Sequence, residues 1–230
     1  MKTEGWTKSE IHEALVTLYL RLNGYFTTGL ILHSPDWGEN RTELDCLAVR
    51  HPNHHQPDRG LEASEFLSQG RNEVDLLFCE VKSLPTELVF NKPLQTDVEA
   101  VRAILRWAGV FREDEVVAVA ERLQPLLKEG VTIDTARNGI VENGCRVRAL
   151  LCCPSCSDDS CIDRWCLVNS EIFGFIAKCF VPSEPRGACS TRYNFRQWGY
   201  AMSPLVQYFK NVPFGKAPNL ADLYAHLGAR

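Results

Sequence analysis

The sequence has no long apolar run and no excess of positive charge. None of its hydrophobic stretches approaches the ~18 residues of a membrane-spanning helix, and the N-terminal stretch is amphipathic rather than continuously apolar like an export signal. We therefore expect a soluble, cytoplasmic protein without a membrane partner. The chain has 25 Lys and Arg against 29 Asp and Glu, a net charge of −4. Proteins that hold nucleic acid by charge alone are usually basic, so any nucleic-acid contact should be local.

The sequence also lacks repeats and compositional bias. Its 15 Gly and 12 Pro follow no period, which excludes a collagen-like chain. Hydrophobic residues make up 45% and charged residues 23%, which is ordinary usage for a globular protein and excludes disorder as the main state. The length of 230 residues fits a single domain over 1–230.

Hydrophobic periodicity predicts an α/β chain in the order helix, three strands, helices, strand, helix. A polar stretch over 51–73 is interpreted as an inserted loop, and 182–230 as a basic, aromatic C-terminal extension. The predicted strands are 25–33, 42–50, 74–83 and 145–152, and the predicted helices are 7–23, 97–109, 113–128, 169–180, 203–211 and 219–227.

Charged residues interrupt this apolar framework at a few points. Asp45 lies in the second strand, and Glu80 and Lys82 lie two apart in the third, so that both side chains leave the same face. The third strand is otherwise apolar on both faces, where an unpaired charge is unfavourable. Glu13 lies on the first helix, with Glu10 as its rival. The alternative interpretation is a coincidental set of solvated charges.

These residue types suit phosphodiester hydrolysis. Hard divalent ions prefer carboxylate oxygens, and a bound ion can generate hydroxide and neutralise developing charge. A lysine beside such a site can orient the attacking water or assist its deprotonation. The sequence therefore favours a divalent-metal site built from the acidic residues, with Lys82 next to it.

The combination of Asp45, the Glu80-Val81-Lys82 strand and a preceding helix with Glu13 resembles the PD-(D/E)XK nuclease superfamily, and locally its Holliday junction resolvases. The resemblance implies a restriction-endonuclease-like α-β-β-β-α-β core, with a four-stranded mixed sheet flanked by helices and a C-terminal helical elaboration. It implies Glu13, Asp45, Glu80 and the Val81 carbonyl as ligands of Mg²⁺ or Mn²⁺, and Lys82 as the catalytic lysine.

The function implied by the resemblance is a metal-dependent DNA endonuclease, acting in repair, recombination or phage defence, as a homodimer or within a larger effector complex. One fold serves many functions, so two alternatives stay open. The negative net charge favours a catalytically silent DNA-binding or assembly subunit. The cysteines favour a cysteine-metal interaction protein.

Four cysteines, Cys153, Cys156, Cys161 and Cys166, fall close together after the fourth predicted strand. Thiolates at this kind of spacing suit tetrahedral Zn²⁺, although the segment between the two pairs is shorter than in the usual zinc ribbon. An iron–sulfur cluster and a set of small buried residues without a site are the alternatives. In a cytoplasmic protein we expect all ten cysteines to be thiols or metal ligands rather than disulfides.

Four arginines are candidates for contacts to DNA. Arg41 and Arg50 flank Asp45 in sequence and are placed to meet phosphates near a metal. Arg192 and Arg196 interleave with aromatic residues, a pattern that suits phosphate neutralisation together with base stacking. The alternative is that these aromatic residues pack a terminal helix onto the core.

Overall fold

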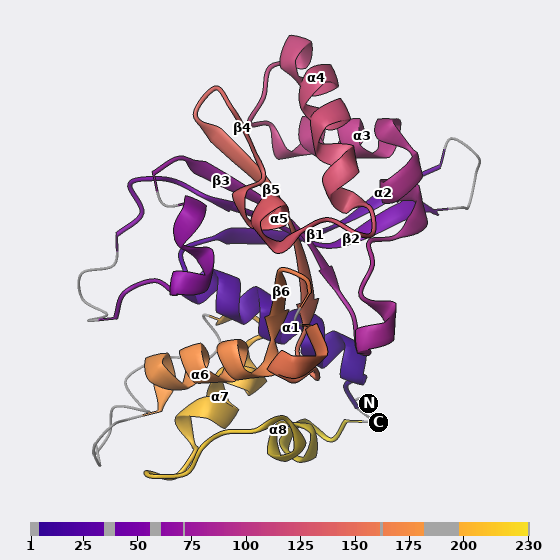
Figure 1. Cartoon of the computed structure of the whole chain (residues 1–230). Helices are drawn as coiled ribbons and strands as arrows, with labels where there is room; N and C mark the ends of the chain where they lie inside the picture. Colours follow the sequence, from indigo (N-terminus) through magenta and orange to yellow (C-terminus); the bar gives the residue numbers. More distant parts are fainter. Residues whose placement is uncertain are drawn as a thin grey trace.

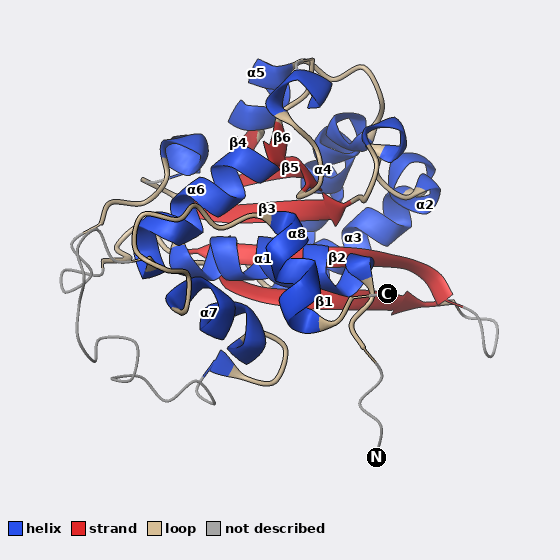
Figure 2. Cartoon of the chain, turned by 90° about the horizontal axis from the view of Figure 1, so that it is seen from below, coloured by secondary structure: helices blue, strands red, loops and turns tan. Residues whose placement is uncertain are grey.

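The computed structural model describes residues 5–34, 40–55, 61–70, 72–161, 163–181 and 198–229. An open, mixed sheet of six strands lies between two layers of helices (Figures 1 and 2). The strand order is β1-β2-β3-β5-β4, and β6 pairs with β5 as well. The strands are β1 (Phe26–His33), β2 (Asn40–Arg50), β3 (Val74–Val81), β4 (Ile140–Glu142), β5 (Cys145–Cys153) and β6 (Cys166–Val168).

The sheet is antiparallel on one side and parallel in its centre. β1, β2 and β3 pair antiparallel, whereas β3 and β5 run parallel. All residues of β3 except Val74 are buried, as expected for a central strand covered on both faces. The predicted α/β class and the mixed sheet flanked by helices are thereby confirmed.

The prediction of four strands is wrong. β4 pairs antiparallel with the first half of β5, and β6 pairs parallel with its last residues, so both extend the same edge. Each of these strands has three residues, which is too short for an alternating pattern to stand out from its surroundings. The specific restriction-endonuclease-like arrangement stays a prediction.

One helical layer is built on α1 (Lys8–Leu22), which runs under the sheet in Figure 1. Thr7 and Glu10 form a capping box that satisfies the free N–H groups at the start of α1. Apolar residues on two sides of α1 are buried, because the helix lies between the sheet and a second set of helices. That set consists of α6 (Asn169–Phe180), α7 (Ser203–Lys210) and α8 (Leu220–Leu227).

The opposite face of the sheet is covered by helices from the middle of the chain (Figure 1). The predicted helix over 113–128 ends at Leu123, and Gln124–Leu127 form a 3₁₀ turn. Pro125 has no N–H to donate and cannot continue a helix interior. The helices concerned are α2 (Lys92–Thr96), α3 (Val98–Ala108) and α4 (Glu113–Leu123), and the short α5 (Ile133–Asn138) follows them.

The stretch predicted as an inserted loop is tied to the core. Glu65–Gly70 form a 3₁₀ helix. The Ser64 backbone N–H donates to Asn23 Oδ1 at 2.7 Å, just after the end of α1.

No helix among the described residues is both long and apolar enough to cross a membrane.

A buried ion pair joins β3 to β5. Asp75 and Arg148 are both fully buried, and Arg148 Nε donates to Asp75 Oδ1 at 2.9 Å. The Tyr25 hydroxyl also donates to Asp75, and the Arg148 guanidinium lies 4.9 Å from the centre of the Trp165 ring. Charges buried this deeply are stable only when they are paired and hydrogen-bonded, and this cluster links the two central strands through their side chains.

Candidate active site

The candidate site begins where β2 separates from β3. Their ladder ends at the pair Cys46–Cys79, after which β2 continues along β1 while β3 continues along β5. The β1–β2 register shifts at this level, so that Asp45 and Cys46 together oppose Gly29 in a β-bulge. Bulges interrupt the alternation of a strand and redirect its side chains.

The side chain of Asp45 occupies the fork between the two strands. Its Oδ2 accepts a hydrogen bond from the Val81 backbone N–H at 2.7 Å. A carboxylate therefore takes the place that a carbonyl of β2 would hold if the ladder continued. The structure thus brings together residues that are 36 positions apart in the sequence.

Glu80 and Lys82 form an ion pair beside this fork. Lys82 Nζ lies 2.6 Å from Glu80 Oε1, and the Glu80 side chain is fully buried. Glu80 Oε2 is also buried and has no hydrogen-bond partner among the described residues. An anionic oxygen without a partner in a low-dielectric interior is unfavourable, so this atom marks a point at which a cation would be stabilising.

Asn91 is a site residue that the sequence did not indicate. It precedes α2, and its Oδ1 lies 3.3 Å from Lys82 Nζ. Its Nδ2 donates to the Glu43 carbonyl of β2 at 3.3 Å. Asn91 therefore links the lysine to the strand that carries Asp45. An asparagine before Lys-Pro predicts only the start of a helix, so no local signal could have revealed this role.

Glu13 reaches the site from α1. A cavity of about 500 Å³ lies between α1, β1 and β2, and both Glu13 and Asp45 line it, whereas Glu80 does not. Ser9 Oγ donates to Glu13 Oε1 at 3.2 Å. Glu10 also lines the cavity, but its carboxylate is used in the capping box with Thr7.

The electrostatics of the site favour protonation of its acids. Burial and the Asp45 carboxylate raise the pKa of Glu80 to about 7, although Lys82 opposes this shift. Burial also raises the pKa of Asp45, against the Val81 N–H and Lys82. Burial and the nearby Asp45 raise the pKa of Glu13. Burial is the largest cause of all three shifts, so the protonated forms of these carboxyl groups are favoured as long as no cation is bound.

The predicted ligand set stays a prediction. Within the described ranges, no three His, Cys, Asp or Glu side chains are grouped so that they could hold a metal ion. Mg²⁺ differs from Zn²⁺ in this respect, because it keeps several waters and is often held by one or two carboxylates together with substrate phosphates. Asp45 and Glu80 are the two carboxylates that could hold Mg²⁺ in this way. The observation in favour is Glu80 Oε2, which is buried and has no hydrogen-bond partner among the described residues.

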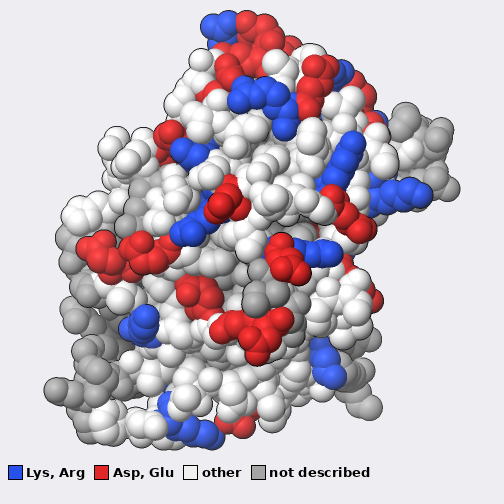
Figure 3. Space-filling model, viewed as in Figure 1, with Lys and Arg blue, Asp and Glu red and all other residues white. Residues whose placement is uncertain are grey.

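Arg41 and Arg50, two of the four predicted DNA-binding arginines, have other surroundings in the structure. Arg41 Nε donates to Asp97 Oδ2 at 2.7 Å, and Arg50 is almost fully buried. Neither lines the cavity that holds Asp45. Arg192 and Arg196 lie outside the described residues. Over α3 and α4, Figure 3 shows Lys and Arg interleaved with Asp and Glu, which matches several ion pairs at these helices.

The cysteines form a buried cluster beside the site but not a set of four thiolates. Cys153 and Cys156 are joined in a disulfide with their Cα atoms 5.3 Å apart, and Cys161 and Cys166 pack next to them. The expectation that all cysteines are thiols or metal ligands is therefore wrong for this pair. The tight Cys-Pro-Ser-Cys turn brings the two Cα atoms within the usual disulfide range, and a disulfide sulfur is not a thiolate ligand.

A buried histidine connects the site to the C-terminal helix. His12 Nδ1 lies 3.1 Å from Ser83 Oγ, directly after Lys82, and His12 Nε2 lies 2.5 Å from the Tyr224 hydroxyl of α8. Burial and the charge of Lys8 lower the pKa of His12 to about 4. The neutral ring thus bridges α1, the end of β3 and α8.

Comparisons with protein-family models, with curated proteins and with solved structures found no match for this chain.

Proposed function

We propose that the protein is a metal-dependent endonuclease that hydrolyses phosphodiester bonds in DNA. The observation that carries the proposal is Glu80, a fully buried carboxylate with one oxygen on Lys82 and the other without a hydrogen-bond partner in the part of the chain that the structure describes. Asp45 at the strand fork supplies a second carboxylate. The resemblance of these residues to PD-(D/E)XK nucleases supports the assignment of the reaction.

Asp45 and Glu80 would hold the ion, with Glu13 at the cavity wall and the Val81 carbonyl as the backbone ligand that the resemblance implies. When bound, Mg²⁺ or Mn²⁺ lowers the pKa of a coordinated water and neutralises charge on the phosphate. A cation also favours the ionised form of Glu80, whose pKa burial has raised to about 7.

Lys82 is the residue best placed to act on the attacking water. Its ammonium group is held between Glu80 Oε1 and Asn91 Oδ1, and its backbone N–H donates to the Cys152 carbonyl at 2.8 Å. Both ends of the side chain are therefore positioned by the fold. An ammonium fixed in this way can orient a water molecule or stabilise charge on a phosphate oxygen.

Cleavage assays test this function directly. Duplex, single-stranded and branched DNA are incubated with the full chain in Mg²⁺ or Mn²⁺, and in EDTA. We expect metal-dependent cleavage that falls by about 100-fold or more in Asp45→Asn and Lys82→Ala. Glu87→Gln is the matched control, because Glu87 is an exposed carboxylate seven positions after Glu80.

Two results contradict the proposal. Cleavage that survives in both Asp45→Asn and Lys82→Ala would reject these residues as the site. Failure to cleave any of the three DNA forms, together with no carboxylate-dependent Mn²⁺ binding in calorimetry, would show a catalytically silent subunit instead.

A further inference from the structure

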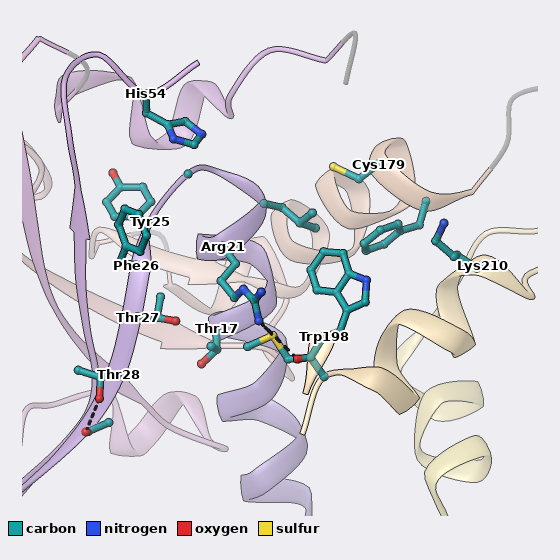
Figure 4. Close-up of a pocket in the computed structure, with 15 residues that line it drawn as sticks. Thr17, Arg21, Tyr25, Phe26, Thr27, Thr28, His54, Cys179, Trp198 and Lys210 are labelled. Atoms are coloured by element: carbon teal, nitrogen blue, oxygen red, sulfur yellow. Dashed lines mark hydrogen bonds between the residues drawn. The ribbon is translucent and has the colours of Figure 1, made fainter. Parts of the chain in front are cut away.

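A second cavity adjoins the acidic one. It has a volume of about 900 Å³ and lies between α1, β1, the end of α6 and the segment that leads into α7 (Figure 4). Thr17, Gly29 and Met202 line both cavities. A ligand in the larger cavity can therefore extend toward Asp45.

The larger cavity differs from the acidic one in charge. Arg21 and Lys210 line it, and none of the 15 lining residues drawn in Figure 4 is Asp or Glu. Among the described residues, no carboxylate forms an ion pair with Arg21. Its Nη1 donates instead to the Trp198 carbonyl at 3.4 Å and to Met202 Sδ at 3.2 Å. In a chain of net charge −4, the charged side chains among these lining residues are thus all positive.

Aromatic side chains line the same cavity. Phe26 begins the edge strand β1, and 72% of its surface is exposed. The Arg21 guanidinium lies over the Trp198 ring, 5.1 Å from the ring centre. The Trp198 and Phe180 rings pack edge-to-face, with their centres 5.7 Å apart. The Phe26 ring packs edge-to-face with the His51 ring, with the ring centres 6.3 Å apart, and most of the Phe26 surface is open to a ligand. Aromatic faces beside cations match the stacked bases and the phosphates of a nucleic acid.

We infer that this cavity binds a single-stranded segment of nucleic acid that leads to the acidic site, an inference that rests on the proposed nuclease function. Phe26 offers an exposed face for an unpaired base, Trp198 holds the Arg21 guanidinium at the cavity wall, and Arg21 and Lys210 would meet the phosphates. Paired bases in a duplex are stacked on one another and cannot place a face on a protein ring. The substrate class that fits is thus DNA with an unpaired arm or end, rather than a continuous duplex.

Binding in EDTA tests the inference without catalysis. Fluorescence anisotropy is measured with labelled single-stranded oligonucleotides of DNA and of RNA, and with a blunt duplex. We expect tighter binding of single strands than of the duplex. Phe26→Ala should raise the Kd for single strands about tenfold, and Lys210→Gln should reduce the slope of log K against log salt by about 0.7. The DNA and RNA arms decide which strand the cavity prefers.

Trp107→Ala is the matched control, because this tryptophan of α3 is 56% exposed and lies in the opposite helical layer. It should bind as the unmodified chain does. Phe26 is largely exposed, so its truncation should leave the melting temperature unchanged, and a melting curve verifies this. Equal affinity of Phe26→Ala, Lys210→Gln and the unmodified chain for single strands would overturn the inference, as would tighter binding of the duplex.

The two proposals fail in different ways. In one outcome, Phe26→Ala loses single-strand binding, Asp45→Asn keeps it, and no substrate is cleaved. This outcome supports single-strand binding in the larger cavity and rejects the nuclease function. In the other outcome, Asp45→Asn abolishes metal-dependent cleavage, whereas Phe26→Ala and Lys210→Gln leave the cleavage of branched DNA unchanged. This outcome supports the nuclease function and rejects the larger cavity as a binding site for single strands.

Discussion

Replacement of Glu80 by Gln should stabilise the metal-free protein at alkaline pH while it abolishes cleavage. The folded chain holds Glu80 at a pKa of about 7, against 4.5 for the free side chain. Each pKa unit corresponds to 1.36 kcal/mol, so the ionised form is disfavoured in the fold by about 3 kcal/mol. Gln has nearly the same shape, keeps an acceptor for Lys82 and carries no charge to bury.

The sign of the effect follows from proton binding. A carboxyl group with a raised pKa binds its proton more tightly in the folded state, so its contribution to stability is complete below pH 4.5 and is lost as the pH rises through about 7. The difference between Glu80→Gln and the unmodified chain should therefore increase over this window. The shift of His12 largely cancels in the difference, because His12 is not among the groups that shift the pKa of Glu80.

Urea unfolding in EDTA at a series of pH values from 5 to 8.5 measures this difference. Mg²⁺ should narrow it at pH 8, because the ion stabilises the ionised carboxylate only in the unmodified chain. Glu87→Gln, the exposed control, should show no such pH dependence. A Glu80→Gln protein that is less stable than the unmodified chain at pH 8 would refute the reasoning that the buried charge is unfavourable without an ion.

Three other predictions concern stability. Asp75→Ala should lower the free energy of unfolding by about 3 to 5 kcal/mol, because it leaves the Arg148 guanidinium buried without its partner; a loss below about 1 kcal/mol in urea unfolding would contradict this. The lowered pKa of His12 should reduce the melting temperature as the pH falls from 6.5 to about 4, and His12→Gln should remove that acid sensitivity. Reduction of the Cys153–Cys156 disulfide by dithiothreitol should lower stability by about 2 kcal/mol, since the closed loop is short. The double Ser variant at these cysteines should not respond to the reductant.

The sequence carried enough information for the central strands and the long helices. β3 was recognisable because an unbroken apolar run is typical of a strand covered on both faces, and the structure buries it between two helical layers. Glu80 and Lys82 stood out for the same reason, as charges within that run. Such signals depend only on neighbours in sequence.

The features that escaped prediction depend on distant segments. Asn91 contacts Lys82 only because α2 follows β3 back toward β2. The bulge that turns Asp45 into the strand fork appears in the register between β1 and β2, which no periodicity encodes. Phe26 and Trp198 are 172 positions apart, and both line one cavity because β1 and the segment before α7 border the same side of α1. The hydrophobic pattern of the sequence predicts helices and strands, whereas tertiary packing determines which side chains come together at a site.

Buried negative charge at the fork between β2 and β3 is unfavourable in the metal-free fold. The ladder stops, a carboxylate of Asp45 replaces a backbone acceptor, and Glu80 Oε2 has no partner among the described residues. A purely structural role would be served better by a neutral side chain at position 80, because burial of charge is then avoided. One bound cation would favour the ionised form of both carboxylates at once. This cost of a buried charge without an ion is the argument for the divalent ion that we propose at this site, and the stability of Glu80→Gln tests it.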